Sequence, residues 1–142
     1  ETTANSEIRL IFKMADLFIK PFVVDLSKDH ASALVSNLGI IVSNMKKNIT
    51  VPLTQNKIDA IVIYLFWRGS FANTTTTNGK MVLEFYQLVN AKNDSGVAEF
   101  IRNRLKKDVD GNDIPFRPGH PDRHNKTAIL YTDGIYANPW LW

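Results

Sequence analysis

The chain has 142 residues, of which 44% are hydrophobic and 22% charged, a composition typical of one globular domain with a substantial core. It contains no cysteine, which excludes a disulfide framework, a thiolate metal site and a thiol nucleophile. The net charge of +3 favours an anionic partner, but the lysine pairs are scattered, so nucleic acid is not indicated. No apolar run reaches the roughly 18 to 20 residues of a membrane span, so no membrane insertion is expected, and the first ten residues lack the features of a signal peptide.

The first third of the chain has the spacing of apolar residues that is typical of helices. Residues 5–19 predict an amphipathic helix, which Pro21 would end. Ser27 is a good N-cap for a second, long helix that runs to the basic pair Lys46 and Lys47. The two lysines suit the negative end of a helix dipole.

The next segment, 51–69, is the least polar part of the chain. Thr54 is a candidate N-cap, and apolar residues then cover both faces of the predicted helix. A helix that is apolar all round belongs at the centre of a fold, and Gly69 lets the chain turn out of it.

The second half of the chain predicts shorter elements. Residues 68–80 form a polar segment with turn chemistry at Asn78-Gly79 and are expected to be an exposed insertion. Two helices are predicted at 81–89 and 95–105, the second capped by Ser95. A long irregular stretch over 108–125 then leads to a last helix at about 126–132. The expected fold is a single all-α domain over residues 1–142, a compact helical bundle.

Two patterns suggest metal ligands, and neither is convincing. His120 and His124 are four residues apart and would share a metal only if that segment were helical, but Pro121 favours a surface loop. The segment DVDGND resembles the start of a calcium loop, yet its glycine is at the fourth position and Gly119 stands where a glutamate is required. We therefore expect no metal and a simple turn at DVDGND.

The sequence offers no catalytic set of its own. Its carboxylates show no spacing that marks an acid and base pair, and no phosphate loop or nucleophile elbow is present. The closing aromatics Tyr136, Trp140 and Trp142 would serve either as platforms for sugar rings or as anchors that hold the C-terminal segment on the core.

Three blocks in order resemble the helical C-terminal lobe of phage-type lysozymes, the muramidases of the T-even kind. DLSKDHASALVSNLGIIVSNMKK resembles the long helix that links the two lobes, and LTQNKIDAIVIYLFWRG resembles the buried central helix. FRPGHPDRHNKTAILYTDGIY resembles the closing segment, in which an aromatic residue, a proline and an arginine lead into a short helix. The corresponding positions are Phe116, Pro121, Arg123, Gly134 and Tyr136.

The sequence departs from that family at two points. The residue that contacts saccharide at the end of the central helix is an amide in the family and Trp67 here. The family's catalytic glutamate, aspartate and threonine, set around a glycine-rich hairpin, have no counterpart in this chain. The resemblance therefore implies a fragment without catalytic residues, taken from a larger bacterial or phage protein such as a tail spike or a type VI secretion spike.

The resemblance implies a muramidase domain that binds peptidoglycan glycan strands and whose parent cleaves between N-acetylmuramic acid and N-acetylglucosamine. The implied substrate-binding residues are Phe66, Trp67, Arg68, His120 and Arg123, and no cofactor is implied. The parent would be exported as a larger protein and would act in the bacterial periplasm or cell wall, and a secreted toxin would have a cognate immunity protein. The alternatives are a non-catalytic module that binds peptidoglycan or protein, and an unrelated helical adaptor.

Overall fold

The computed structural model describes residues 28–69 and 75–136, with side chains from Leu38 onward. Within these ranges the chain forms helices and no strand, and its one β-type contact is an isolated bridge between Lys107 and Asp113. The predicted all-α bundle is therefore confirmed, whereas the helix predicted at 5–19 lies outside the described residues. The helices are α2 (Lys28–Asn48), α3 (Gln55–Arg68), α4 (Thr77–Asn90), α5 (Asp94–Asn103) and α6 (His120–Asp133).

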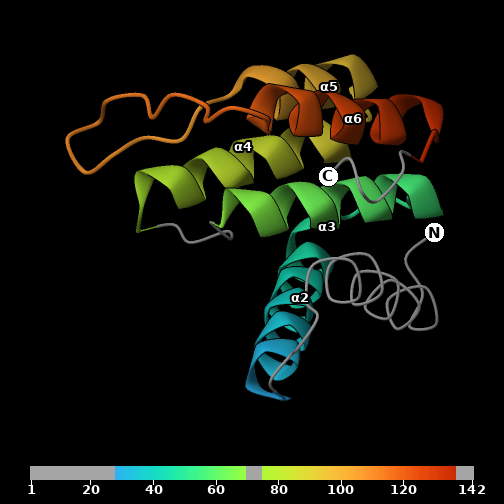
Figure 1. The fold of residues 1–142 in the computed structure, drawn as a ribbon. Coiled ribbons are helices and arrows are strands. Elements are labelled where there is room, and N and C mark those ends of the chain that lie inside the picture. The colour runs from blue at the N-terminus through green and yellow to red at the C-terminus, as the bar shows by residue number, and fades with distance from the viewer. Residues whose placement is uncertain (1–27, 70–74, 137–142) are drawn as a thin grey trace.

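Helix α3 is the central element, as its apolar sequence predicts. Every residue from Ile58 to Leu65 is buried, on all sides of the helix. Figure 1 shows α5 and α6 together on one side of α3, while α2 runs steeply away from the other, and α3 packs against both α2 and α6. Burial on all sides is the arrangement that a helix without a polar face requires.

The two ends of α3 differ in how they are closed. Thr54 is the N-cap in an extended conformation, but its side chain makes no capping hydrogen bond. Gly69 ends the helix in the left-handed conformation, with φ of 77°, and its N–H donates to the Leu65 carbonyl at 3.0 Å. A glycine adopts this conformation without strain, so the predicted helix end at Gly69 is confirmed.

The prediction that 68–80 is a polar insertion with a turn at Asn78-Gly79 is wrong over its last residues. Helix α4 begins at Thr77, and Asn78 and Gly79 lie in its first turn. The Thr76 hydroxyl accepts a hydrogen bond from the Gly79 N–H at 3.0 Å, so it acts as the N-cap. The propensity of Asn and Gly for turns is outweighed by this cap and by the tertiary contacts of Asn78.

Helix α5 begins and ends slightly earlier than predicted. Its N-cap is Asn93, whose side chain accepts from the Gly96 N–H at 3.0 Å, so the assignment of Ser95 as the cap was wrong. Its residues Val97, Phe100 and Ile101 face inward and are buried. The helix stops at Asn103, where the chain leaves the bundle.

Helix α6 corrects the sequence prediction most clearly. It begins at His120, not near Lys126, and Pro121 occupies its first turn. Proline is well tolerated there because the first N–H groups of a helix have no partner within it. Gly119, in the left-handed conformation with φ of 88°, supplies the sharp entry. His120 and His124 therefore do lie one helical turn apart.

The segment 104–119 is a long loop that extends beyond the end of the bundle (Figure 1). Its tip is the turn predicted at DVDGND, where Asp108 Oδ1 accepts from the N–H groups of Asp110 and Asn112, each at 2.9 Å. The base of the loop is held by Asn78, whose amide donates to the Lys107 carbonyl at 2.8 Å and accepts from the Lys107 N–H at 2.9 Å. This paired contact fixes the loop against α4.

None of the helices in the described ranges has the length and apolar character needed to cross a membrane.

Candidate functional site

A cavity of about 100 Å³ lies where the C-terminal end of α3, the N-terminal half of α6 and the 104–119 loop meet. Its walls combine aromatic rings with basic side chains. The lining residues are Tyr64, Trp67, Arg68, Arg104, Lys106, Ile114, Pro115, Phe116, Arg117, His120, Arg123 and His124.

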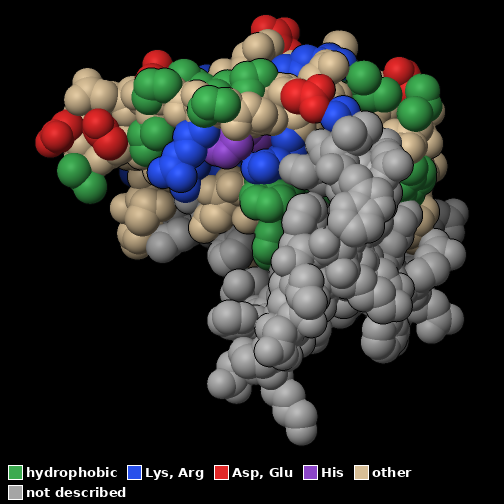
Figure 2. Space-filling model, in the orientation of Figure 1, with side chains coloured by type: hydrophobic (Ala, Val, Ile, Leu, Met, Phe, Trp, Pro, Cys, Tyr) green, Lys and Arg blue, Asp and Glu red, His purple; other side chains and the backbone are tan. Residues whose placement is uncertain are grey.

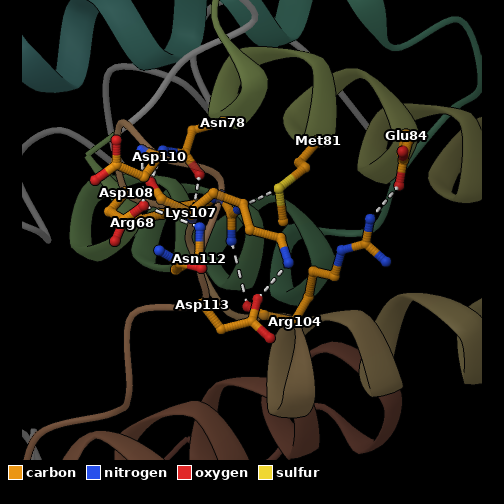
Figure 3. A network of polar contacts seen from close by, with 10 residues as sticks. All are labelled: Arg68, Asn78, Met81, Glu84, Arg104, Lys107, Asp108, Asp110, Asn112 and Asp113. Carbon is orange, nitrogen blue, oxygen red and sulfur yellow. Dashed lines mark hydrogen bonds and ion pairs between the residues drawn. The ribbon is translucent and has the colours of Figure 1, made fainter.

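Arg68 is the most buried cation of this cavity, with only 4% of its surface exposed. Its Nη1 donates to the Tyr64 hydroxyl at 2.9 Å and to the Arg104 carbonyl at 3.4 Å, and its Nη2 contacts the Met81 sulfur at 3.6 Å. Figure 3 shows the guanidinium next to Met81, with other polar residues around it. All three acceptors are neutral, and Nε has no partner. The charge of Arg68 is therefore not neutralised by a carboxylate within the described structure.

Three further basic residues reach the cavity from the 104–119 loop. Arg104 forms an exposed ion pair with Glu84 at 3.1 Å, seen in Figure 3. Lys106 and Arg117 have no ion pair within the described residues, and burial together with the charge of Arg68 lowers the pKa of Lys106. The loop thus adds positive charge to a site that already contains a buried cation.

The two histidines of α6 complete the basic wall. Their ring centres are 6.2 Å apart, and the His124 ring lies 4.9 Å from that of Phe116 and 5.9 Å from that of Tyr64. Burial lowers the pKa of His124 to about 4, and the charges of His120, Arg123 and Arg68 contribute to the same shift. The pKa of His120 is lowered as well, through burial and the charges of two arginines. Both shifts oppose protonation, as expected in a positive potential.

Trp67 and Arg123 form a contact at the same site. Arg123 Cζ lies 3.8 Å from the centre of the Trp67 ring, a cation–π geometry. The Trp67 side chain is 36% exposed and also packs edge-on against Phe66, with ring centres 5.3 Å apart. Trp67 is therefore held from two sides and still has surface available to a ligand.

No Asp or Glu side chain belongs to the lining of this cavity. Figure 2 shows the result on one face, where blue Lys and Arg side chains flank a purple histidine. In a site with apolar walls, charges interact more strongly than in water. The arrangement is suited to binding an anion, and it offers no pair of carboxylates for acid and base catalysis.

Metal binding finds no support in the described part of the chain. No group of three His, Asp or Glu residues is placed to hold an ion, so the helical spacing of His120 and His124 does not produce a metal site.

The buried carboxylate of Asp59 accepts a hydrogen bond from Gln55 at 2.7 Å and another from the Tyr136 hydroxyl. Tyr136 therefore connects the last described residues to α3, whereas Trp140 and Trp142 lie outside the described residues.

Four of the five predicted substrate-binding residues line the one cavity: Trp67, Arg68, His120 and Arg123. Phe66 does not, because its side chain packs partly buried against the core beside Trp67.

Tyr64, Arg104, Lys106 and Arg117 also line the cavity, although the sequence does not predict them as site residues. The Tyr64 side chain is almost fully buried, and Lys106 belongs to one of the scattered lysine pairs. The one available signal was the number of basic residues on either side of DVDGND, but which of them face the cavity depends on how the loop folds back.

Comparison with protein-family models, with curated protein sequences and with solved structures finds no match. The similarity to phage-type lysozymes therefore rests on the three sequence blocks alone.

Proposed function

We propose that this chain is the saccharide-binding helical lobe of a lysozyme-like peptidoglycan hydrolase. In this proposal it grips the glycan strand, and carboxylates elsewhere in a longer parent protein cleave between N-acetylmuramic acid and N-acetylglucosamine. The parent would act in the bacterial periplasm or cell wall.

The observation that carries the proposal is that two helix ends contribute side chains to the same cavity. The end of α3 contributes Trp67 and Arg68, and the start of α6 contributes His120 and Arg123. The two pairs come from separate sequence blocks that resemble the lysozyme lobe. Their chemistry also suits the polymer, because an indole stacks on sugar rings and cations attract the carboxylates of lactyl and peptide groups.

The second candidate is a module that binds without belonging to a catalytic protein, and the absence of carboxylates from the cavity lining favours it over an active site within this chain. Its ligand would be peptidoglycan or a protein with an acidic surface. If the parent is a secreted toxin, an immunity protein that covers Trp67 and His120 would be such a partner.

Incubation with purified peptidoglycan sacculi tests the proposal. We expect the chain to sediment with sacculi and to release no muropeptides with new muramic-acid reducing ends, as followed by mass spectrometry. Release of such ends would show that this chain carries its own catalytic residues. A chain that stays in the supernatant would refute saccharide binding.

The role of Trp67 is tested by Trp67→Ala, with Ile40→Ala as the matched control. Ile40 is a large apolar residue on α2 that is 47% exposed and lies outside the cavity lining. We expect the Trp67 variant to lose most sacculus binding and the control to keep it. Unchanged binding by a folded Trp67→Ala protein would remove Trp67 from the site.

A further inference from the structure

The basic cavity contains more positive charge than the described structure neutralises. Arg68 is almost fully buried, all its hydrogen-bond acceptors are neutral, and its Nε has no partner. A buried charge without a counter-charge costs several kcal/mol in general. Proximity to the Tyr64 and Phe100 rings, each 5.8 Å from Cζ, offsets only part of such a cost.

The loop brings further cations to Arg68. Lys106 and Arg117 line the same cavity and have no ion pair within the described ranges. Like charges in a partly apolar site repel one another. A bound anion would relieve this repulsion and would supply the missing counter-charge of Arg68.

The size and the remaining lining of the cavity limit what that anion can be. A volume of about 100 Å³ is enough to admit a small oxyanion group together with some of its water. Ile114, Pro115 and Phe116 form an apolar wall that is largely open to solvent, since Ile114 is 44% exposed and only Phe116 is half-buried. Such a wall suits a charged group attached to a larger molecule that can cover the opening.

We infer that this cavity is a receptor for one oxyanion group, a carboxylate or a phosphate, held by Arg68, Lys106 and Arg117. The identity of the molecule that carries this carboxylate or phosphate rests on the proposed function. A peptidoglycan strand supplies lactyl and peptide carboxylates, and phosphate-bearing polymers attached to the wall supply phosphates. Trp67, which lines the same cavity and is 36% exposed, would contact the adjoining sugar.

The first test uses free anions, so that it is independent of peptidoglycan. Sodium phosphate and sodium acetate are titrated into the protein at constant ionic strength, with chloride as the balancing ion, while NMR follows the Arg68 Nε and His124 ring signals. We expect saturable shifts of both signals with at least one of the two anions. The absence of any saturable shift with either anion would overturn the inference.

Variants assign the binding to named residues. Lys106→Gln and Arg117→Gln should each weaken anion binding roughly tenfold, the loss expected for one charge-assisted hydrogen bond. Lys47→Gln makes the same change in charge at the exposed end of α2 and should bind like the unaltered chain. If Lys106→Gln and Lys47→Gln lost anion affinity equally, the loss would be due to the change in net charge alone, and the proposed binding site would be refuted. Because both substituted site residues belong to the loop and not to the helical core, the variants are expected to fold, which their NMR spectra check.

The second test separates the inference from the proposed function. Sacculi are used untreated, with their carboxyl groups amidated, or with phosphate polymers removed by acid. Weaker binding after amidation identifies carboxylate as the source, and weaker binding after acid treatment identifies phosphate. The oxyanion receptor would be refuted if the unaltered chain bound all three forms of sacculi equally and Lys106→Gln bound them as well as the unaltered chain does. Saccharide binding would still stand in that case. Saturable binding of free anions without binding to sacculi would refute the proposed function and keep the receptor.

Discussion

The guanidinium of Arg123 lies over the Trp67 ring, with Cζ 3.8 Å from the ring centre. The contact joins the last turn of α3 to the first turns of α6, two elements that are far apart in the sequence. It holds both side chains at the edge of the basic cavity and fixes the orientation of the indole that would face a ligand.

This contact should be measurable as a coupling energy. In a double-mutant cycle with Trp67→Leu and Arg123→Gln, we expect the two substitutions to be coupled by about 1 kcal/mol, because a partly shielded cation–π pair has that strength. Urea unfolding of the four proteins gives the free energies of unfolding. The cycle cancels the other contacts of each side chain, so strictly additive effects would show that the pair does not stabilise the fold.

His124 should make the protein less stable in mild acid. Its pKa is about 4 in the folded protein, through burial and the charges of His120, Arg123 and Arg68, and about 6.5 in an unfolded chain. The charged groups of the cavity on the loop, at positions 104, 106 and 117, add to the same positive field. Between these two values the unfolded state binds more protons, so stability falls as the pH drops from about 6.5 to about 4 and this loss ends below pH 4. The full difference corresponds to about 3 kcal/mol.

Urea unfolding at several pH values measures this loss. His124→Gln keeps a polar side chain that does not titrate, so most of the fall in stability between pH 6.5 and 4 should disappear. His120→Gln should remove a smaller part, because the pKa of His120 is also lowered. His30 is present in every variant and cancels from the comparison. An unchanged pH profile in His124→Gln would contradict a buried neutral histidine.

Asn78 should control the cavity without lining it. Its amide makes two hydrogen bonds with the backbone of Lys107, at 2.8 and 2.9 Å, and so positions the loop that carries Lys106 and Arg117 (Figure 3). Asn78→Ala should destabilise the fold by about 1 to 2 kcal/mol and increase hydrogen exchange of the Lys107 amide. Lys80→Ala, at an exposed position of the same helix, is the control. Unchanged exchange at Lys107 would mean that the loop is held by other contacts.

Tyr136 should stabilise the fold and take no part in binding. Its hydroxyl donates to the buried carboxylate of Asp59, which also accepts from Gln55. Tyr136→Phe removes that donor and keeps the ring, so we expect a loss of about 1 to 2 kcal/mol in the free energy of unfolding and no change in sacculus binding. Chemical denaturation and sedimentation measure the two quantities. Weaker binding at unchanged stability would instead favour a sugar platform.

Much of the helical architecture could be predicted from the sequence. The apolar residues of 58–65 cover every side of their helix, and burial of such a surface leaves the centre of a bundle as its only suitable place. Gly69 follows from the same reasoning, because a left-handed residue ends a helix most easily as glycine. Even four of the five proposed binding residues share a cavity, although they were chosen from a family resemblance and not from geometry.

Only the tertiary structure decided where α4 and α6 begin and which basic side chains share the cavity. The spacing of apolar residues indicates which face of a helix is buried, but it does not indicate which distant segments come into contact. Asn78 lies in a helix since its amide pairs with a backbone 29 residues away, a contact that no local pattern contains. Helix α6 starts at His120 because Gly119 turns the chain sharply enough for Pro121 to occupy the first turn. The charges of Lys106 and Arg117 look scattered along the chain and become a site only in the folded loop, which the two Asn78 hydrogen bonds hold against α4 despite the repulsion from Arg68.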